Sequence, residues 1–439
     1  MSRYWYGRLI ILSLFLILLM PPEAPAKTLT VSAAEGNSLA DALNAANAGD
    51  VILVGFGVYR EEGLVVKNGV TLRGASEYAH WVRIESAGGM SVLNLGNAGP
   101  QTRIENLTIS FRSDAVPAAV AHGAGAVLYN SAPVFENVVF TGLAADYGGA
   151  VSCSASSPTF LRCRFMHNAA RAVGGAVNGT QSSLPVFEDC LFVGNTAAVG
   201  GTLNAAHGSA ATLIGCTVVE GAAGVAAGLA TWNAPGSSLE RTILTGGSGG
   251  RGWDGDAASA PAALCTDIFG NEGGDWVGAL AGLDGADGNL SADPQFCYAG
   301  NVDNPYGLNE YSPCAPAANP GCGQIGAFAV SCLFVVADAG QEDGGLPAVS
   351  RLHPNYPNPF NPRTTVRFDL AGAGHVDLAV YDVAGRLVKR LVATSLPAGT
   401  HEAFWEGRDS AGRRAAAGVY FFRLKTAETV AIHRAALVK

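Results

Sequence analysis

Short segments of alternating apolar and polar residues recur through the middle of the chain. One register aligns residues 133–140, 158–165 and 185–192, each of which begins with proline and has phenylalanine at its third and eighth positions. The first of these columns continues through looser copies, at intervals of 25 to 27 residues, as Phe135, Phe160, Phe187, Leu213 and Leu239. A repeat of this length must be interpreted before any single element is assigned.

The pattern inside each repeat predicts strands. Apolar residues alternate with period two, as at Cys163 and Phe165, and Gly, Asn, Ser or Pro interrupts the pattern after three to five residues. Helical repeats would need longer runs of period 3.6, and each glycine of the pairs Gly148-Gly149 and Gly174-Gly175 would weaken such a helix by roughly 1 kcal/mol. Leucine-rich repeats need a leucine ladder that is missing here. We therefore predict a parallel β-helix, in which equivalent residues stack about 4.8 Å apart.

The composition agrees with such stacking. Charged residues make up 14% of the chain and glycine fills 57 positions, and only eight charged residues fall between Ala115 and Pro235. In a solenoid each residue faces its copy on the next turn, where like charges are destabilising. An apolar content of 49% excludes global disorder, and the net charge of −9 offers no basic surface for nucleic acid.

Two further motifs carry a resemblance to a known superfamily. The tetrads at 148–151 and 174–177 read Gly-Gly-Ala-Val, and Phe165 to Asn168 and Phe192 to Asn195 read Phe-x-x-Asn. These segments resemble the repeats of polymorphic outer-membrane-protein and pectate-lyase-like right-handed parallel β-helices. Residues 38–61 resemble the N-terminal cap of that superfamily, and residues 289–327 resemble its closing turns. The resemblance implies an all-β fold, with the β-helix spanning residues 27–335.

The N-terminus is predicted to be a secretory signal peptide, residues 1–26. Arg3 and Arg8 precede an apolar run from Leu9 to Met20, and Ala24-Pro25-Ala26 supplies the small residues of a cleavage site. Twelve apolar residues are too few to cross a bilayer, which needs about 20. We expect no transmembrane segment in the mature protein, which is secreted or held at the surface of a two-membrane bacterium.

The last hundred residues differ in pattern from the repeats. Residues 336–350 have no periodicity and are predicted to be a linker, and residues 351–439 contain alternating strands typical of a small β-sandwich. The motifs at 356–362, 380–388, 405–409 and 418–420 resemble the FlgD-type immunoglobulin-like domain that serves as a type IX secretion sorting domain. The resemblance implies the type IX-like secretion machinery as a partner.

The repeats offer little material for catalysis. A general acid and base, or a bound cation, needs oxygen atoms within a few Å of one another. The column Glu136, Leu161, Glu188, Ile214 places carboxylates only on alternate turns, about 10 Å apart. We predict no catalytic residues. The alternative is a carbohydrate-active enzyme, either a polysaccharide lyase or a glycoside hydrolase, built on the β-helix.

Several residues are candidates for binding. Trp232 and Trp253 would stack on sugar rings if they are exposed, or pack in the core if they are not. Asn178 and Asn204 lie in one small polar column, which is either an internal hydrogen-bonded ladder or part of a flat binding face. Asp254 and Asp256 lie in an acidic, glycine-rich stretch that would hold Ca²⁺ or simply be a solvated loop. No other cofactor is expected.

The nine cysteines all lie between Cys153 and Cys332. Cys163, Cys190 and Cys216 share a column beside inward phenylalanines and are interpreted as buried thiols, although one bridge between neighbours would be geometrically allowed. Cys297, Cys314, Cys322 and Cys332 fall in the irregular closing segment, where three pairings are open and two structural disulfides are expected.

Together these observations predict a non-catalytic, adhesin-like protein that binds polysaccharide or another cell-surface ligand.

Overall fold

A computed structural model gives the fold of residues 25–33, 35–86, 88–112, 120–297, 306–332, 349–355, 358, 360, 364–382, 385–410, 413–427 and 429–438. The chain divides into two compact units, residues 1–334 and 335–439. Most of the predicted signal peptide (residues 1–24), most of the predicted linker (residues 336–348) and parts of the C-terminal motifs lie outside the described residues.

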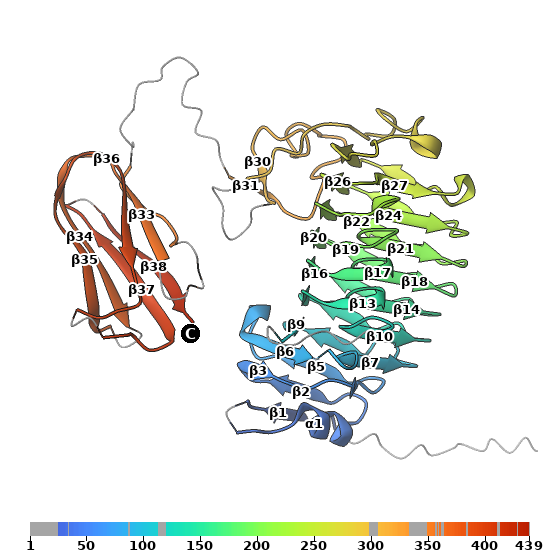
Figure 1. Ribbon diagram of the computed structural model, residues 1–439, viewed down its shortest axis with the longest axis horizontal. Coiled ribbons are helices and arrows are strands. Elements are labelled where there is room, and N and C mark those ends of the chain that lie inside the picture. The colour runs from blue at the N-terminus through green and yellow to red at the C-terminus, as the bar shows by residue number, and fades with distance from the viewer. Residues whose placement is uncertain are drawn as a thin grey trace, which may run out of the picture. The chain divides into compact units, whose positions relative to one another are not determined.

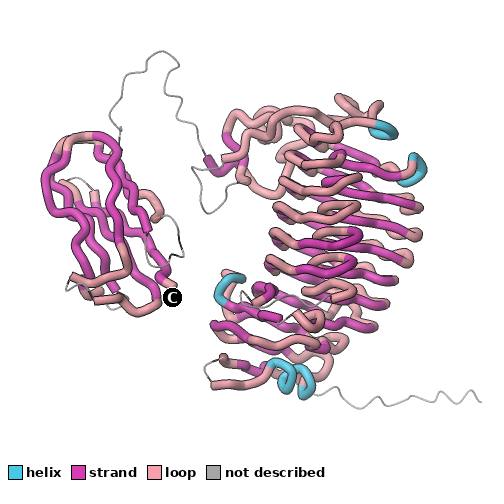
Figure 2. Tube along the Cα trace, viewed as in Figure 1, coloured by secondary structure: helices cyan, strands magenta, loops and turns pink. Residues whose placement is uncertain are grey.

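The first unit is a parallel β-helix built from three long sheets, as the repeat predicts (Figures 1 and 2). Sheet A contains, in spatial order, β1 (Thr28–Val31), β2 (Val51–Val54), β5 (Thr71–Gly74), β8 (Arg103–Glu105), β11 (Val134–Glu136), β15 (Thr159–Leu161), β19 (Val186–Glu188), β22 (Thr212–Ile214), β25 (Ser238–Glu240) and β28 (Ala262–Leu264). Sheet B contains β3 (Gly57–Tyr59), β6 (Val82–Ser86), β9 (Thr108–Phe111), β12 (Val139–Thr141), β16 (Arg164–Met166), β20 (Leu191–Val193), β23 (Thr217–Val219), β26 (Ile243–Thr245) and β29 (Asp267–Phe269).

Sheet C contains β4 (Leu64–Val65), β7 (Leu93–Gly96), β10 (Ala126–Tyr129), β14 (Val151–Ser154), β18 (Val177–Thr180), β21 (Leu203–Ala206), β24 (Ala226–Trp232) and β27 (Arg251–Gly255). The turns that lead from sheet B back to sheet C add a two-stranded ladder of β13 (Ala144–Tyr147) and β17 (Ala169–Val173). Each turn of the solenoid therefore visits sheets C, A and B in that order.

The predicted register holds in the core. Phe135, Phe160 and Phe187 pair strand to strand, and their rings stack with centroids 5.0 and 4.9 Å apart. A second stack, Phe140, Phe165 and Phe192, meets the first edge to face. All six rings are fully buried. Rings stacked along the solenoid axis fill the core on these three turns with a single residue type, phenylalanine.

Polar ladders line the inner corners. The thiols of Cys163, Cys190 and Cys216 are free and buried, and each donates a hydrogen bond to a backbone carbonyl of the preceding turn. Thr242 and Thr266 continue this ladder with their hydroxyl groups. Burial raises the pKa of the Cys190 thiol, which keeps it protonated as a donor. The column is thus a hydrogen-bonded ladder of thiols, in agreement with the interpretation as buried thiols.

Both ends of the solenoid core are covered. At the N-terminal end, helix α1 (Leu39–Ala45) begins after the N-cap Ser38 and buries Leu39 and Leu43. At the other end, Trp276 and Leu280 of the segment around the short helix η3 (Gly278–Leu280) join the same hydrophobic core. Without such caps the terminal strands would expose unpaired edges to other chains.

Residues 306–332, which we call the strap, fold back along the outer face of sheet B. The strap contains β30 (Leu308–Asn309) and β31 (Val330–Cys332), and buries Leu191, Val193, Val219 and Ile243 against its own Leu308 and Ile325. The backbone N–H of Ala327 donates to the Thr217 hydroxyl, and the Arg164 guanidinium lies over the Phe328 ring. The repeat pattern gave no indication of this cover, because the strap itself does not repeat.

The strap changes the cysteine assignment. Cys322 is bonded to Cys265, which occupies an outer corner of the last turns, and Cys314 is a free, buried thiol. Cys322 is therefore a disulfide cysteine, as predicted, but its partner lies outside the four closing cysteines, and the prediction of a disulfide at Cys314 is wrong. Cys297 is disulfide-bonded, and the side chain of Cys332 lies outside the described residues. The bridge to Cys265 attaches the strap to the solenoid rather than closing a loop within the strap.

The second unit is an antiparallel β-sandwich. One sheet contains β32 (Arg351–Leu352), β33 (Thr364–Leu370) and β36 (Gly399–Trp405), and the other contains β35 (Leu387–Leu396), β34 (Gly374–Asp382), β37 (Gly418–Lys425) and β38 (Val430–Leu437). Trp405 is fully buried, contacts Phe360 and Tyr420, and donates from its indole N–H to the Arg408 carbonyl. An all-β chain with these two architectures is the predicted fold class.

Candidate functional site

Sheet C lacks formal charge on every strand except β27, which carries Arg251 and Asp254. The seven strands from β4 to β24 contain no Asp, Glu, Lys or Arg, and neither do the turns that lead from β7 to β24 into sheet A. The outward positions are small or polar, with aromatic rings at two of them. This face, visible as the stack from β7 to β24 in Figure 1, is the candidate functional site.

Two exposed aromatic residues lie in one outward column of this face. Tyr129 ends β10 and Trp232 ends β24, with 60% and 42% of their surfaces exposed. The register pairs Tyr129 with Ser154, Ser154 with Thr180, and Ala206 with Trp232. Tyr129 and Trp232 are therefore four strand spacings apart, about 19 Å at 4.8 Å per strand. We call this column the Tyr129–Trp232 strip.

Amide groups border the strip at the adjoining corner. Asn97, Asn130 and Asn233 adopt left-handed backbone conformations there, which asparagine tolerates better than most residues. The Asn130 amide donates to the Asn97 carbonyl oxygen over 2.7 Å, and the Ser154 hydroxyl donates to Gln181 over 2.6 Å. Both contacts are exposed to solvent. The strip therefore presents hydrogen-bonding groups of both kinds between its two rings.

The predicted asparagine column lies beside the strip and is buried. Asn178 and Asn204 are only 4% and 7% exposed, and the Asn204 amide donates to the Asn178 carbonyl oxygen over 2.8 Å. Of the two interpretations of this column, the hydrogen-bonded ladder matches the geometry. Asn178 and Asn204 alternate with the core residues Val177 and Leu203, so they face the same side of sheet C as the strip, but their burial leaves little surface for a ligand.

Trp253 is likewise structural. It is 2% exposed, and its indole N–H donates to the Thr231 hydroxyl over 2.8 Å. Trp276 is buried and donates to the Leu290 carbonyl. Of Trp232, Trp253 and Trp276, only Trp232 is exposed enough to stack on a sugar ring. Tyr129, which we did not predict, is the second exposed ring; it occupies the repeat position equivalent to the ends of the other sheet C strands, which is the signal that could have identified it.

Asp254 and Asp256 are held by nearby partners. Asp254 pairs with Arg251 at 3.5 Å and accepts from the Gly255 backbone N–H. Asp256 accepts from the Asn233 backbone N–H and the Ser259 hydroxyl, and these hydrogen bonds lower its pKa. Across the described residues no three His, Cys, Asp or Glu side chains gather to hold a metal ion. The calcium site stays a prediction.

Sheet A carries a pair of carboxylates on neighbouring turns that the sequence alignment missed. Glu105 pairs in register with Glu136, so acidic groups do occur on adjacent turns. Arg73 and Arg103 contact Glu105, and Arg103 and Arg162 contact Glu136. Burial would raise the pKa of Glu105, but hydrogen bonds from Arg103 and Arg73 outweigh it and lower that pKa. A general acid needs the opposite shift, so this cluster is an ion-paired network.

A carboxyl group with a raised pKa, that of Asp267, lies under the strap. Asp267 is fully buried, and its carboxylate accepts from the Ala292 backbone N–H and from the Cys314 thiol over 3.2 Å. Burial raises the pKa of Asp267 to about 7 despite these hydrogen bonds. Burial also raises the pKa of Cys314, so its thiol stays protonated. Both groups are buried beneath the strap and out of reach of a substrate.

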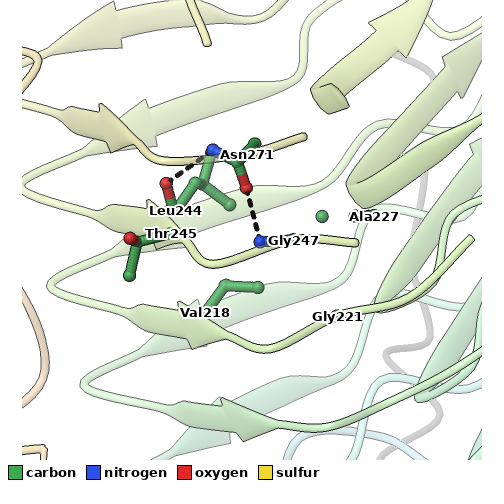
Figure 3. Close-up of a pocket in the computed structure, with 8 residues that line it drawn as sticks. Val218, Gly221, Ala227, Leu244, Thr245, Gly247 and Asn271 are labelled. Carbon is green, nitrogen blue, oxygen red and sulfur yellow. Dashed lines mark hydrogen bonds between the residues drawn. The ribbon is translucent and has the colours of Figure 1, made fainter. Parts of the chain in front are cut away.

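A small cavity inside the solenoid has a structural cause (Figure 3). Asn168 and Asn195 form an inner ladder in which each side chain accepts a backbone N–H of the preceding turn. Asn271 does the same for the Gly247 N–H and donates to the Leu244 carbonyl. Gly221 and Gly247 occupy the two ladder positions between Asn195 and Asn271, and because they have no side chains a cavity is left there. The cavity is too small to admit a water molecule. It is a packing gap.

Comparison with known proteins finds one family model and several solved structures that are similar to parts of this chain. The FlgD Ig-like domain model matches residues 361–429. Among solved structures, pectin methylesterase PemA from Erwinia chrysanthemi is 15% identical, covering 61% of this chain and 92% of its own, with a TM-score of 0.32. The Acinetobacter phage vB_ApiP_P1 tailspike protein is 11% identical, covering 93% and 78%, with a TM-score of 0.35.

A third solved structure is PorZ of Porphyromonas gingivalis, described as a surface component of the type IX secretion system. It is 22% identical over 20% of this chain with a TM-score of 0.16, and the chain spans only 11% of its length. No curated protein matches the chain. In the part of the chain that the structure describes, no helix is long and apolar enough to cross a membrane. The chain is thus a parallel β-helix followed by a FlgD Ig-like domain.

Proposed function

We propose that the protein is an exported, non-catalytic binding protein whose β-helix meets polysaccharide or another cell-surface ligand. The observation that carries the proposal is the open face of sheet C from β4 to β24, with exposed Tyr129 and Trp232 and no Asp, Glu, Lys or Arg among these strands. Exposed aromatic rings beside hydrogen-bonding groups are the usual elements of a recognition surface.

The absence of an acid–base pair on this face supports binding over turnover. Lysis or hydrolysis of a glycan needs a group that moves a proton close to the scissile bond. The carboxylates of sheet A are paired with arginines, and Asp267 is enclosed by the strap. The strands β4 to β24 of sheet C supply binding groups without a carboxylate or a basic side chain, and the nearest such groups are His207 in the turn after β21 and Asp254 on β27.

A test combines a binding assay with a product assay on the purified protein. We expect retention on immobilised polysaccharides without release of reducing ends or of unsaturated uronate products, with and without Ca²⁺. Unsaturated product absorbance from any uronate polysaccharide would overturn the non-catalytic proposal and favour a lyase.

The C-terminal unit is proposed to direct the protein to the surface. The match to the FlgD Ig-like domain supports this, because the motifs at residues 380–388 and 405–409 resemble a type IX sorting domain. Residues 351–439 belong to a separate compact unit, so their deletion should leave the β-helix folded but retained in the periplasm. Surface exposure of the truncated protein would show that the sorting role is wrong.

A further inference from the structure

The charges of the central turns are distributed unevenly among the faces. Residues 120–250, all of which the structure describes, contain ten charged side chains. They lie on sheet A, on the corners between sheets A and B, on β16, on the β13–β17 ladder and directly after β23, at Glu136, Glu188, Glu240, Arg162, Asp189, Arg241, Arg164, Asp146, Arg171 and Glu220. Sheet C and the turns from sheet C to sheet A carry none of them.

This distribution determines which ligand charge the face accepts. A polyanionic chain loses hydration when it lies on a protein surface, and that loss must be offset by cations placed opposite its carboxylates or sulfates. The Tyr129–Trp232 strip provides no Lys or Arg for this purpose. A neutral chain needs no such compensation, because ring stacking and amide or hydroxyl hydrogen bonds suffice to hold it.

The groups present along the strip match an uncharged polyhydroxylated chain. Tyr129 and Trp232 offer ring faces at the two ends, about 19 Å apart over four strand spacings. Asn130 supplies an amide group beside Tyr129, and Gln181 supplies one between the two rings, at the corner bordering the strip. The flat register of β10 to β24 aligns these groups along the solenoid axis.

We propose that the Tyr129–Trp232 strip binds a neutral glycan chain that lies along the solenoid axis, with sugar rings stacked on Tyr129 and Trp232. This inference rests on the proposed binding function and narrows its ligand to uncharged polysaccharides. Because no charged side chain takes part, binding should depend little on ionic strength between 50 and 500 mM salt, taken here as roughly the range over which exposed ion pairs become screened.

The test uses the full-length mature protein and two sets of oligosaccharides of equal length. One set is neutral (glucan, mannan and xylan) and the other is acidic (polygalacturonate and alginate). We expect a neutral oligosaccharide to bind with salt-independent affinity and the acidic ones to bind at least about tenfold more weakly. Trp232→Ala and Tyr129→Ala should each weaken the neutral interaction by about tenfold or more, whereas Trp232→Phe should retain most of it.

Tyr311→Ala is the matched control, because Tyr311 is 59% exposed and lies in the strap. It should leave affinity unchanged, and all variants should keep the thermal midpoint of the parent because each altered residue has 42 to 60% of its surface exposed and belongs to no core cluster. Salt-sensitive binding of an acidic glycan that is lost in Trp232→Ala would overturn the neutral ligand while keeping the binding function. Binding of no glycan at all would overturn both, and neutral binding that survives both alanine variants would overturn the strip.

Discussion

The outer faces of sheets B and C are produced by the same repeat, yet one is covered and the other is open. On sheet B the outward column runs Arg164, Leu191, Thr217, Ile243 and Asp267, and each of these contacts the strap or its cluster. On sheet C the strip runs from Tyr129 to Trp232 through small polar residues that remain partly exposed.

The comparison shows that the inward residues specify the solenoid and the outward ones specify its use. Leu191 and Ile243 are buried because the strap lies on them, and the Cys265–Cys322 disulfide ties that strap to the solenoid. Gly326 approaches so closely that a Cβ atom there would meet the Ile243 side chain at 2.6 Å. A face that the chain covers itself is a stability element, and a face left open is free for a partner.

The largest expected effect comes from a charge placed beneath the strap. Ile243→Asp puts a carboxylate at a fully buried position against the strap, without a cation to pair with it. We expect a loss of about 3 to 5 kcal/mol in the free energy of unfolding, because the buried charge must be desolvated or neutralised. Urea denaturation measures the loss, and labelling of Cys314 by a thiol reagent reports strap opening. An unchanged labelling rate would mean that Ile243 is not held beneath the strap.

The next largest effect is a pH dependence of stability that we expect from Asp267 on the covered face of sheet B and not from the open face of sheet C. Asp267 has its pKa raised from 3.8 to about 7 by burial, with repulsion from Asp275 and Asp293 adding to the shift. The folded state therefore keeps a proton that the unfolded state releases, so the stabilisation present at acidic pH is lost as pH rises toward 7. Between pH 5 and 8 this amounts to about 2 to 3 kcal/mol.

Asp267→Asn isolates this dependence. Urea denaturation of both proteins is measured from pH 5 to 8. The free energy of unfolding of the parent protein should fall as pH rises through this range, and that of Asp267→Asn should lack the part of the fall that Asp267 causes. Ligand binding on the Tyr129–Trp232 strip, whose residues include no carboxylate, should show no pH dependence that Asp267→Asn abolishes. Parallel stability curves for the two proteins would show that Asp267 is ionised in the folded state already at pH 5.

The inner structure could be predicted from sequence because it repeats. The columns that contain Phe135 and Phe140 hold phenylalanine on three successive turns and other apolar residues on the turns beside them, and period-two alternation identifies their strands without knowledge of the rest of the chain. The outward environment does not follow from the same pattern. Asn204 and Trp253 were candidates for binding because a polar or aromatic residue on a strand has the same sequence signature whether its outer side is covered or open.

Irregular segments account for the other differences. Glu105 and Glu136 were not aligned because Asn106 and Asn137, which follow them, are 31 residues apart, longer than the 25 to 27 residues of the other turns. The Cys265–Cys322 bond spans 57 residues and depends on the path of the strap, for which the repeat gives no template. Both errors arise where local spacing no longer determines three-dimensional neighbours.

The smallest expected effect is the same chemical change made on the open face. Ala206→Asp places a carboxylate in the strip at a partly exposed position, where its neighbour in register is Trp232 and no acidic residue of β18 or β24 opposes it. We expect a change within about 0.5 kcal/mol in urea denaturation, because the carboxylate stays hydrated and meets no like charge. Ile243→Asp, measured in parallel, provides the contrast. A loss above about 2 kcal/mol for Ala206→Asp would mean that another part of the chain covers sheet C, which would remove the open face on which the binding function depends.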